Sequence, residues 1–225
     1  MICISGIKNI KTLRKGDKMK KGILVIGVVL IIMLLLSGCI DEATHVENDT
    51  TKYDELKIEM QQDEINRTKF EKLMFKGIRK NVDGDYSYGY AACDFENAGA
   101  NYDAGYLDVA STYYDSADFV YAMANDYYKE AESYFDRAIN FAPNNNMKEL
   151  ASLMKDESMY AAQITSVLHQ NCEYMSSASN AYYIEEYTLG NEQLEIANTF
   201  IITHDSLIPP FENASASINS LLDLL

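Results

Sequence analysis

The chain has few of the residues that break helices and few of those that carry catalysis. Its 225 residues include three prolines, three histidines and no tryptophan. Strand-like alternation of apolar and polar residues is also missing, so long helices are the expected structure. The sequence has no Gly-rich phosphate loop, nucleophile elbow, HExxH or CxxC motif. We therefore expect neither an enzyme nor a bound metal or cofactor.

The histidines lack the neighbours that metal sites require. Glu42 and His45 have the spacing seen in di-iron helical bundles, but no second copy of this pair follows. His169 and Glu173 would share one helix face, where they provide only two ligands. His204 continues an apolar stripe. All three histidines are therefore expected to be structural.

Oxygen-bearing side chains gather around Gly84, in a segment with the composition of a turn. Asn81, Asp83 and Asp85 lie there, but their order differs from that of a calcium loop, and the glutamate at the twelfth position is missing. We expect a solvated turn that ends a helix over residues 51–80.

The N-terminal region has the three parts of a secretory signal. Lysines at 20 and 21 precede an apolar run over 22–36, and a Ser-Gly pair lies directly before Cys39. This pattern resembles the lipobox of prokaryotic lipoproteins, archaeal ones included, in which the cysteine thiol carries a diacylglyceryl group and becomes the mature N-terminus. The resemblance implies lipidation of Cys39 with palmitate-type chains. It also implies a protein anchored in the cell membrane on its extracytoplasmic face.

An uncleaved single span is the alternative to a cleaved signal. Residues 22–40 fall just short of the ~20 apolar residues that a span needs, and both alternatives have the same topology. The codons for Gly16 and Asp17 can contain a ribosome-binding sequence, which favours Met19 as the true start. Residues 1–38 are then a leader and signal peptide, and residues 39–50 form a polar, flexible tether.

Basic residues are scarce after the signal. Residues 39–225 hold 12 Lys/Arg against 33 Asp/Glu, a net charge of −21. Binding to phosphates depends on Lys and Arg, so nucleic acid is excluded as a partner. The same charge opposes flat contact with an anionic membrane. Residues 51–225 are therefore expected to form an acidic, all-helical extracytoplasmic domain.

The strongest pattern is a small residue at every seventh position. One series of alanines runs from Ala110 to Ala138, with aromatic residues three and four positions after most members. A second series of small residues runs from Ala151 to Ser179. Such series are typical of closely packed helices. Two helices of about 40 residues, each ~60 Å long, should pair as an antiparallel hairpin.

Proline, asparagine and glycine predict where these helices end. Pro143 should end the first helix, and Asn146 with Glu149 resembles a capping box that begins the second. Gly190 is expected to end the second helix. The pair Pro209-Pro210 should split the remaining chain into two shorter helices.

The expected fold is all-α, an elongated antiparallel bundle of about four long helices after the signal segment. The last two short helices cover residues 191–207 and 211–225. Residues 86–105 are left open between a kink and a loop, because the register of small residues slips before Ala110.

Cys93 and Cys172 are expected to be free thiols. In the predicted hairpin Cys172 lies opposite Ala117, which places Cys93 ~36 Å away along the axis. The Cα atoms of a disulfide must lie within ~7 Å of one another. Cys172 would then be a small core residue.

Tyrosine is the most abundant aromatic residue, and the rings in the seven-residue series are expected to be buried. Tyr86, Tyr88 and Tyr90 are expected outside the core. Asparagines that begin an N-x-S/T sequon are candidates for glycosylation: Asn48, Asn66 and Asn213.

Residues 128–139 look like the second helix of a tetratricopeptide repeat, because Ala131, Phe135, Ala138 and Pro143 fall at that family's spacing. The match covers about half of one repeat, and no 34-residue copy follows. The resemblance implies binding of a peptide or protein in a concave groove. A coiled-coil seam explains the same alanines without such a groove.

Two functions follow from these patterns. The first is a surface lipoprotein whose helical bundle has a structural or protein-interaction role and binds another envelope protein. The second is a ligand-binding or sensory bundle for a small molecule or a cell-wall glycan, using the tyrosine-rich residues 86–114. The series of small residues are also compatible with a homo-oligomer.

Overall fold

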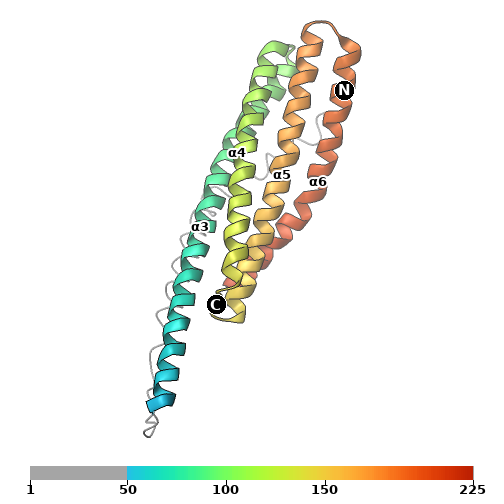
Figure 1. Cartoon of the computed structure of the whole chain (residues 1–225). Coiled ribbons are helices and arrows are strands. Elements are labelled where there is room, and N and C mark those ends of the chain that lie inside the picture. The colour runs from blue at the N-terminus through green and yellow to red at the C-terminus, as the bar shows by residue number, and fades with distance from the viewer. Residues whose placement is uncertain (1–49, 225) are drawn as a thin grey trace.

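The structure is a computed structural model that describes residues 50–224. It contains four α-helices: α3 (Thr50–Asp103), α4 (Leu107–Ile139), α5 (Asn145–Tyr183) and α6 (Tyr187–Leu222). The predicted all-α, elongated bundle of about four helices is confirmed (Figure 1). The predictions for Cys39, His45 and Asn48, and for nearly all of the tether, lie outside the described residues.

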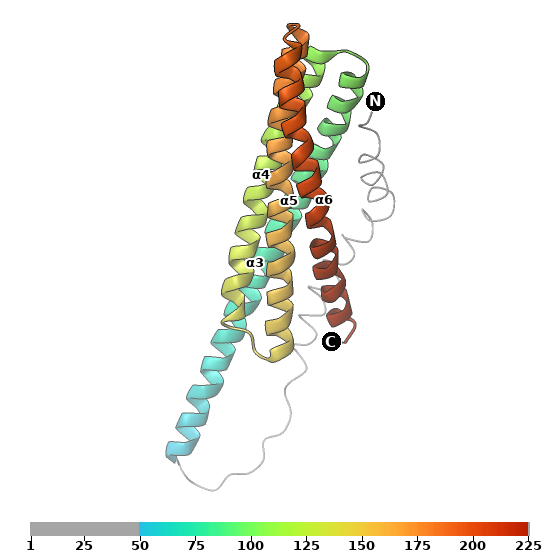
Figure 2. The ribbon, with the colours of Figure 1, turned by 90° about the vertical axis from the view of Figure 1, so that its right-hand side faces the viewer.

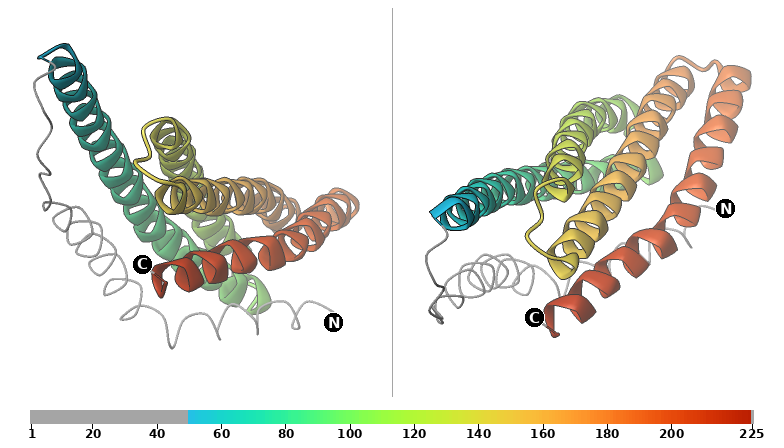
Figure 3. Two further views of the ribbon diagram at one scale, coloured as in Figure 1. Left: turned by 90° about the horizontal axis from the view of Figure 1, so that it is seen from below. Right: turned by 60° about the horizontal axis from the view of Figure 1, so that its bottom comes forward.

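The helices pack in chain order. α3 lies on α4, α4 on α5 and α5 on α6, with few contacts between α3 and α5. Seen from below, α3 crosses the other helices obliquely (Figure 3). A core cluster at the lower end draws side chains from all four helices, including Phe70, Phe135, Leu150 and Ile218.

The N-terminal part of α3 extends beyond the other helices (Figures 1 and 2). Residues 56–65 are all exposed, and Phe70 is the first fully buried side chain of α3. The first ~20 residues of α3 therefore form a projecting helix about 30 Å long, at 1.5 Å per residue.

The interface between α3 and α4 is a ladder of rings set against small residues. A Cβ on Gly77 would lie 2.5 Å from the Phe135 ring, and a Cβ on Gly84 would lie 2.8 Å from the Tyr128 ring. Further along, Ala91 packs with Tyr121 and Ala98 with Tyr114. Each step of seven residues along α3 thus matches a step of seven back along α4.

This ladder explains why the prediction of a helix end at residues 81–84 is wrong. α3 runs without interruption to Asp103. A glycine inside a helix costs about 1 kcal/mol relative to alanine, but at residue 84 any larger side chain would displace the Tyr128 ring. Gly84 therefore permits close packing and does not end the helix. The open segment 86–105 is likewise helical through Asp103.

The two predicted series of small residues are buried. The alanines of α4 and the small residues of α5 have essentially no exposed surface: Ala110, Ala117, Ala124, Ala131, Ala138, Ala151, Ser158, Thr165, Cys172 and Ser179. Polar bonds cross the α4–α5 interface at intervals. Asn125 donates to the carbonyl of Ala162, and the hydroxyls of Ser111 and Ser176 lie 2.9 Å apart.

Two predicted helix boundaries near α5 need correction. The N-cap is Asn144, whose side chain accepts a hydrogen bond from the Met147 amide at 2.8 Å, and not Asn146. Gly190 does not end α5, because α5 ends at Tyr183 and Gly190 is buried in the first turn of α6. A Cβ on Gly190 would lie 2.8 Å from the Tyr182 ring, so glycine here also serves packing.

The predicted split at Pro209-Pro210 is wrong as well, because both prolines lie inside α6. Proline removes a backbone hydrogen bond and favours a bend, and α6 is curved along its length (Figure 3). Ile208 and Phe211, on either side of the pair, pack against the core. These contacts hold the helix together where its local sequence favours a break.

The two hairpins are built alike. In the first turn the amides of Gly105 and Tyr106 donate to carbonyls of Tyr102 and Asn101. In the second turn the same two bonds recur 80 residues further along the chain, from Glu185 and Glu186. Tyr106 and Glu186, the residues before α4 and α6, also have nearly the same backbone angles. The α3–α4 and α5–α6 turns therefore share one backbone conformation.

Candidate functional site

The structure brings His169 against α4. Its Nδ1 lies 2.5 Å from Oδ1 of Asp118, without the alignment of a hydrogen bond. Burial raises the pKa of Asp118, and the nearby His169 partly opposes that rise. Glu173, which was expected to share a helix face with His169, adds negative charge near Asp118 and so also raises the pKa of Asp118. Within residues 50–224, no group of three or more His, Cys, Asp or Glu is arranged to hold a metal ion.

His204 lies at the α5–α6 interface. Its side chain is buried, and Nδ1 lies 3.1 Å from Oδ1 of its neighbour Asp205. Among the described residues Nε2 has no hydrogen-bond partner. About two helical turns before His204, the carbonyl of Ala197 accepts a hydrogen bond from the Asn171 side chain at 2.7 Å. The bond between Asn171 and Ala197 joins α5 to α6.

The predicted solvated turn around Gly84 is absent, because its residues are part of the continuous helix α3. Asn81 accepts a hydrogen bond from Ser158 of α5 at 2.9 Å. Asp85 accepts one from the Tyr128 hydroxyl at 2.8 Å. Both side chains therefore link α3 to neighbouring helices.

The tyrosines of residues 86–114 do not form one surface. Tyr86 and Tyr90 are exposed, as predicted, but Tyr88 packs against the core and meets the Tyr121 ring edge-on at 5.7 Å. Burial raises the pKa of Tyr88 to about 12. It also raises the pKa of Tyr121 and Tyr128 well above the ordinary value.

Cys93 is an exposed thiol and Cys172 a buried one, and burial raises the pKa of Cys172. The geometric argument for their separation is nevertheless wrong. The α3–α4 turn brings residue 93 back to the level of Ala117 and Cys172. Asp94, its neighbour, accepts a hydrogen bond from Ser116 at 2.6 Å, and Ala91 packs in one cluster with Ala117 and Cys172.

The two described sequons lie on helices. Asn66, on the projecting part of α3, accepts a hydrogen bond from Gln62 at 3.0 Å. Asn213, on the second half of α6, is exposed. Both remain predictions as glycosylation sites.

A group of exposed aromatic side chains lies where the two hairpin turns meet, at the end opposite to the start of α3 (Figure 1). We call this region the distal tip and define it by eight residues: Tyr102, Tyr106, Tyr182, Tyr183, Ile184, Glu185, Glu186 and Tyr187. The rings of Tyr102 and Tyr182 meet edge-on at 6.2 Å and join the two turns. Tyr182 also lies 6.3 Å from the Tyr187 ring.

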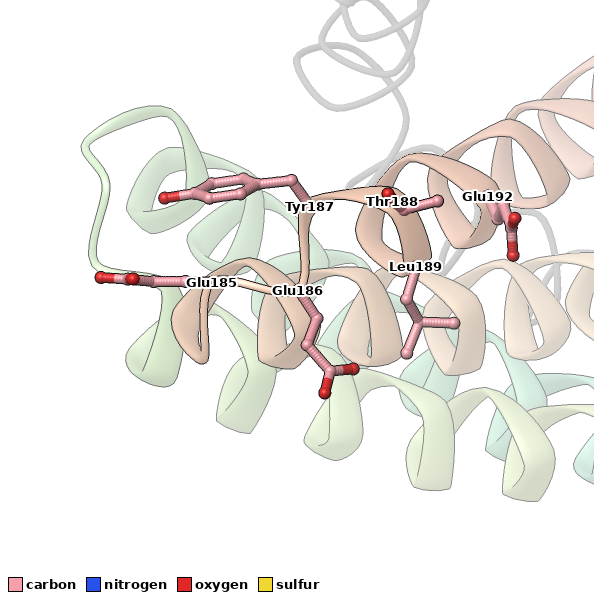
Figure 4. A pocket seen from close by; sticks show the side chains of 6 residues that line it. All are labelled: Glu185, Glu186, Tyr187, Thr188, Leu189 and Glu192. Atoms are coloured by element: carbon pink, nitrogen blue, oxygen red, sulfur yellow. The ribbon is translucent and has the colours of Figure 1, made fainter.

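Four large apolar or aromatic side chains of the distal tip are more than half exposed. Tyr106, Tyr183, Ile184 and Tyr187 are 62%, 60%, 59% and 60% exposed. Beside them lies an open depression of about 470 Å³, lined by residues of the second turn and the start of α6 (Figure 4). Its carboxylates come from Glu185, Glu186 and Glu192.

Sequence reasoning missed this region. Residues 184–186 contain no proline, glycine or asparagine, and they were expected to be the interior of a helix ending at Gly190. Glu185 nevertheless has a φ of 65°, whereas Gly105 occupies the matching place of the first turn with a φ of 82°.

No described helix is long and apolar enough to cross a membrane. Compared with protein-family models, curated proteins and solved structures, the chain gives no match in any of the three.

Proposed function

We propose that the protein is a lipid-anchored, extracytoplasmic lipoprotein whose helical bundle binds another envelope protein. The lipobox-like segment ending at Cys39 supports the anchor. The exposed aromatic residues of the distal tip carry the proposal of binding, because large apolar side chains gathered on one exposed surface mark interaction sites.

The course of the chain fits a role at a distance from the membrane. Lipid on Cys39 would hold the N-terminal end of α3, whose projecting helix adds about 30 Å between the anchor and the bundle. The distal tip lies at the far end of the same axis (Figure 2). The tip would thus be the part of the molecule most accessible to a partner.

Mass spectrometry of the protein extracted from membranes with a mild detergent tests this proposal. The expected result is a chain beginning at Cys39, with the mass of two or more acyl chains and a second protein in stoichiometric amount. The Cys39→Ser variant should leave the membrane fraction or keep its signal. A wild-type chain that still carries residues 19–38 would contradict lipidation, and a lipidated chain that never co-purifies with or cross-links to another protein would contradict the interaction.

A ligand-binding role is the second candidate, and the depression at the tip is the observation that favours it. Tyrosine rings and carboxylates are suited to sugars, because the rings stack and the oxygens accept hydrogen bonds. A thermal-shift screen with cell-wall sugars separates the two functions. A saturable rise in melting temperature that Tyr187→Ser abolishes supports the ligand role, and no rise with any sugar contradicts it.

A further inference from the structure

Charge is distributed very unevenly along the bundle. Residues 81–128 contain nine Asp/Glu and residues 158–211 contain six, and neither segment contains a Lys or Arg. These segments are the upper parts of the four helices and both hairpin turns (Figure 1). The basic residues of the four helices all lie towards the opposite end, in residues 52–80 and 129–155. Within residues 50–224, the distal part of the bundle thus contains carboxylates and no basic residue.

At the lower end the chain supplies cations to its own tyrosine rings. The amine of Lys80 lies 4.9 Å from the centre of the Tyr127 ring. The amine of Lys76 lies 5.4 Å from the Tyr134 ring, and Arg137 approaches the same ring. A cation over an aromatic face is a stabilising arrangement, and the more so away from water. The rings of the distal tip lie in segments that have no Lys or Arg to occupy such positions.

We propose that the distal tip binds a Lys- and Arg-rich segment of the partner protein. This inference rests on the proposed function and adds to it the surface and the chemistry of the partner. The ammonium or guanidinium groups would stack on Tyr106, Tyr183 and Tyr187 and pair with the carboxylates of Glu185 and Glu186. The surrounding negative field would speed the encounter with a basic partner.

The same charge argues against other proteins at this surface. A second copy of the chain would bring an equally negative tip against the first, and like charges repel over the Debye length of about 8 Å at physiological salt. An acidic partner would meet the same repulsion. A basic partner would instead complement the negative charge of the two upper segments, which hold fifteen Asp/Glu.

The second turn offers a substitution that removes a carboxylate without harming the turn. Glycine adopts a positive φ without strain, as Gly105 does in the first turn. Glu185→Gly should therefore keep or improve the fold while it weakens binding. A loss of binding in this variant would not come from unfolding.

Fluorescence anisotropy with a labelled octalysine peptide tests the inference. The protein is the lipidated mature chain in nanodiscs of zwitterionic lipid, at 150 mM salt. The first variant, Glu185→Gly with Glu186→Gln, removes the charge of the tip, and the second, Tyr106→Ser with Tyr187→Ser, removes two rings. The matched control, Asp126→Asn with Glu195→Gln, removes two exposed carboxylates from the acidic part of the bundle away from the tip.

We expect the peptide to bind, with a Kd that rises tenfold or more in the charge variant and at least fivefold in the ring variant. The control should change the Kd less than twofold, and an octaglutamate peptide should not bind. Equal weakening by the control would mean diffuse attraction to the whole acidic surface and would overturn the inference. So would no binding of octalysine. A partner that still co-purifies with the tip variants would leave the proposed function intact and reject this surface alone.

Discussion

At the scale of single residues, the glycines of α3 differ in what surrounds them. Gly84 faces the Tyr128 ring at a distance that excludes a Cβ, whereas Gly89, five residues later in the same helix, has nothing within 4 Å of a Cβ. The sequence alone gives no means to tell these glycines apart. Only the register of α3 on α4 does so, which explains why a packing glycine was interpreted as a helix end.

Alanine substitution at these two positions should have opposite effects. Gly84→Ala should lower the free energy of unfolding by about 1–2 kcal/mol, because overpacking costs more than the gain in helix propensity. Gly89→Ala should raise it by about 0.5–1 kcal/mol through helix propensity alone. Urea unfolding followed by circular dichroism measures both. Equal stabilisation by the two substitutions would contradict the packing of α3 on α4.

The buried tyrosines predict a loss of stability in alkali. Because folding raises the pKa of Tyr88 to about 12, and that of Tyr121 and Tyr128 above the usual value of 10, the folded state favours the neutral phenols. The contribution of these three phenols to the free energy of unfolding is complete below about pH 10, and it is lost as the pH rises through their pKa values in the folded state.

Urea unfolding at pH 8 to 12 measures how the free energy of unfolding depends on pH. Tyr88→Phe should reduce the slope of this free energy against pH by the equivalent of up to one bound proton. The exposed Tyr90→Phe is the matched control and should not change the slope. If all tyrosines ionised near pH 10 while the far-UV circular dichroism spectrum remained native, the three rings would be accessible to solvent, contrary to the structure.

Glu185 should be the least favourable residue of the second turn for stability. A non-glycine residue in the left-handed region costs roughly 1–2 kcal/mol. Glu185→Gly should recover part of this, raising the free energy of unfolding by about 0.5–1 kcal/mol. The reverse change in the first turn, Gly105→Glu, should lower it by a similar amount. Thermal unfolding compares the two, and a destabilised Glu185→Gly variant would contradict the conformation of the turn.

At the scale of helices, the seven-residue periodicity predicted the structure better than the positions of glycine and proline did. The seven-residue series placed the buried faces of α4 and α5 correctly, because burial follows directly from which residues share a face. The ends predicted from Gly84, Gly190 and Pro209 were wrong. At Gly84 and Pro209, packing against a neighbouring helix outweighs a local preference of a few kcal/mol, whereas the end of α5 comes earlier than Gly190, at Tyr183. The one correct break, at residues 140–144, combines Pro143 with the N-cap Asn144.

The projecting part of α3 should contribute little to the stability of the bundle. Removing residues 50–64 should change the free energy of unfolding by less than about 0.5 kcal/mol, because the region contains no buried side chain among the residues described. Removing residues 50–74 also deletes Phe70, Leu73 and Met74, each worth about 2–5 kcal/mol when truncated, and should unfold the protein. Equal effects of the two deletions would mean that the projecting helix packs on the bundle.

At the scale of the whole molecule, basic residues and exposed aromatic residues lie at opposite ends of the long axis of the bundle. One end of the bundle holds its lysines and arginines, and the other holds carboxylates and exposed tyrosines. The net charge was evident from composition, but the hairpin turns determine which segments come together at each end. The distal tip could not be predicted because its two turns lie 80 residues apart and the second lacks turn residues.

Photo-crosslinking in intact membranes tests most directly whether the tip binds a basic partner. A benzophenone amino acid replaces Tyr187 at the tip or, as the control, Tyr90 on the exposed side of α3. We predict a single adduct from position 187, absent from position 90, whose cross-linked peptide is rich in Lys and Arg. Equal adducts from both positions, an adduct with an acidic or neutral segment, or no adduct at position 187 would contradict the account.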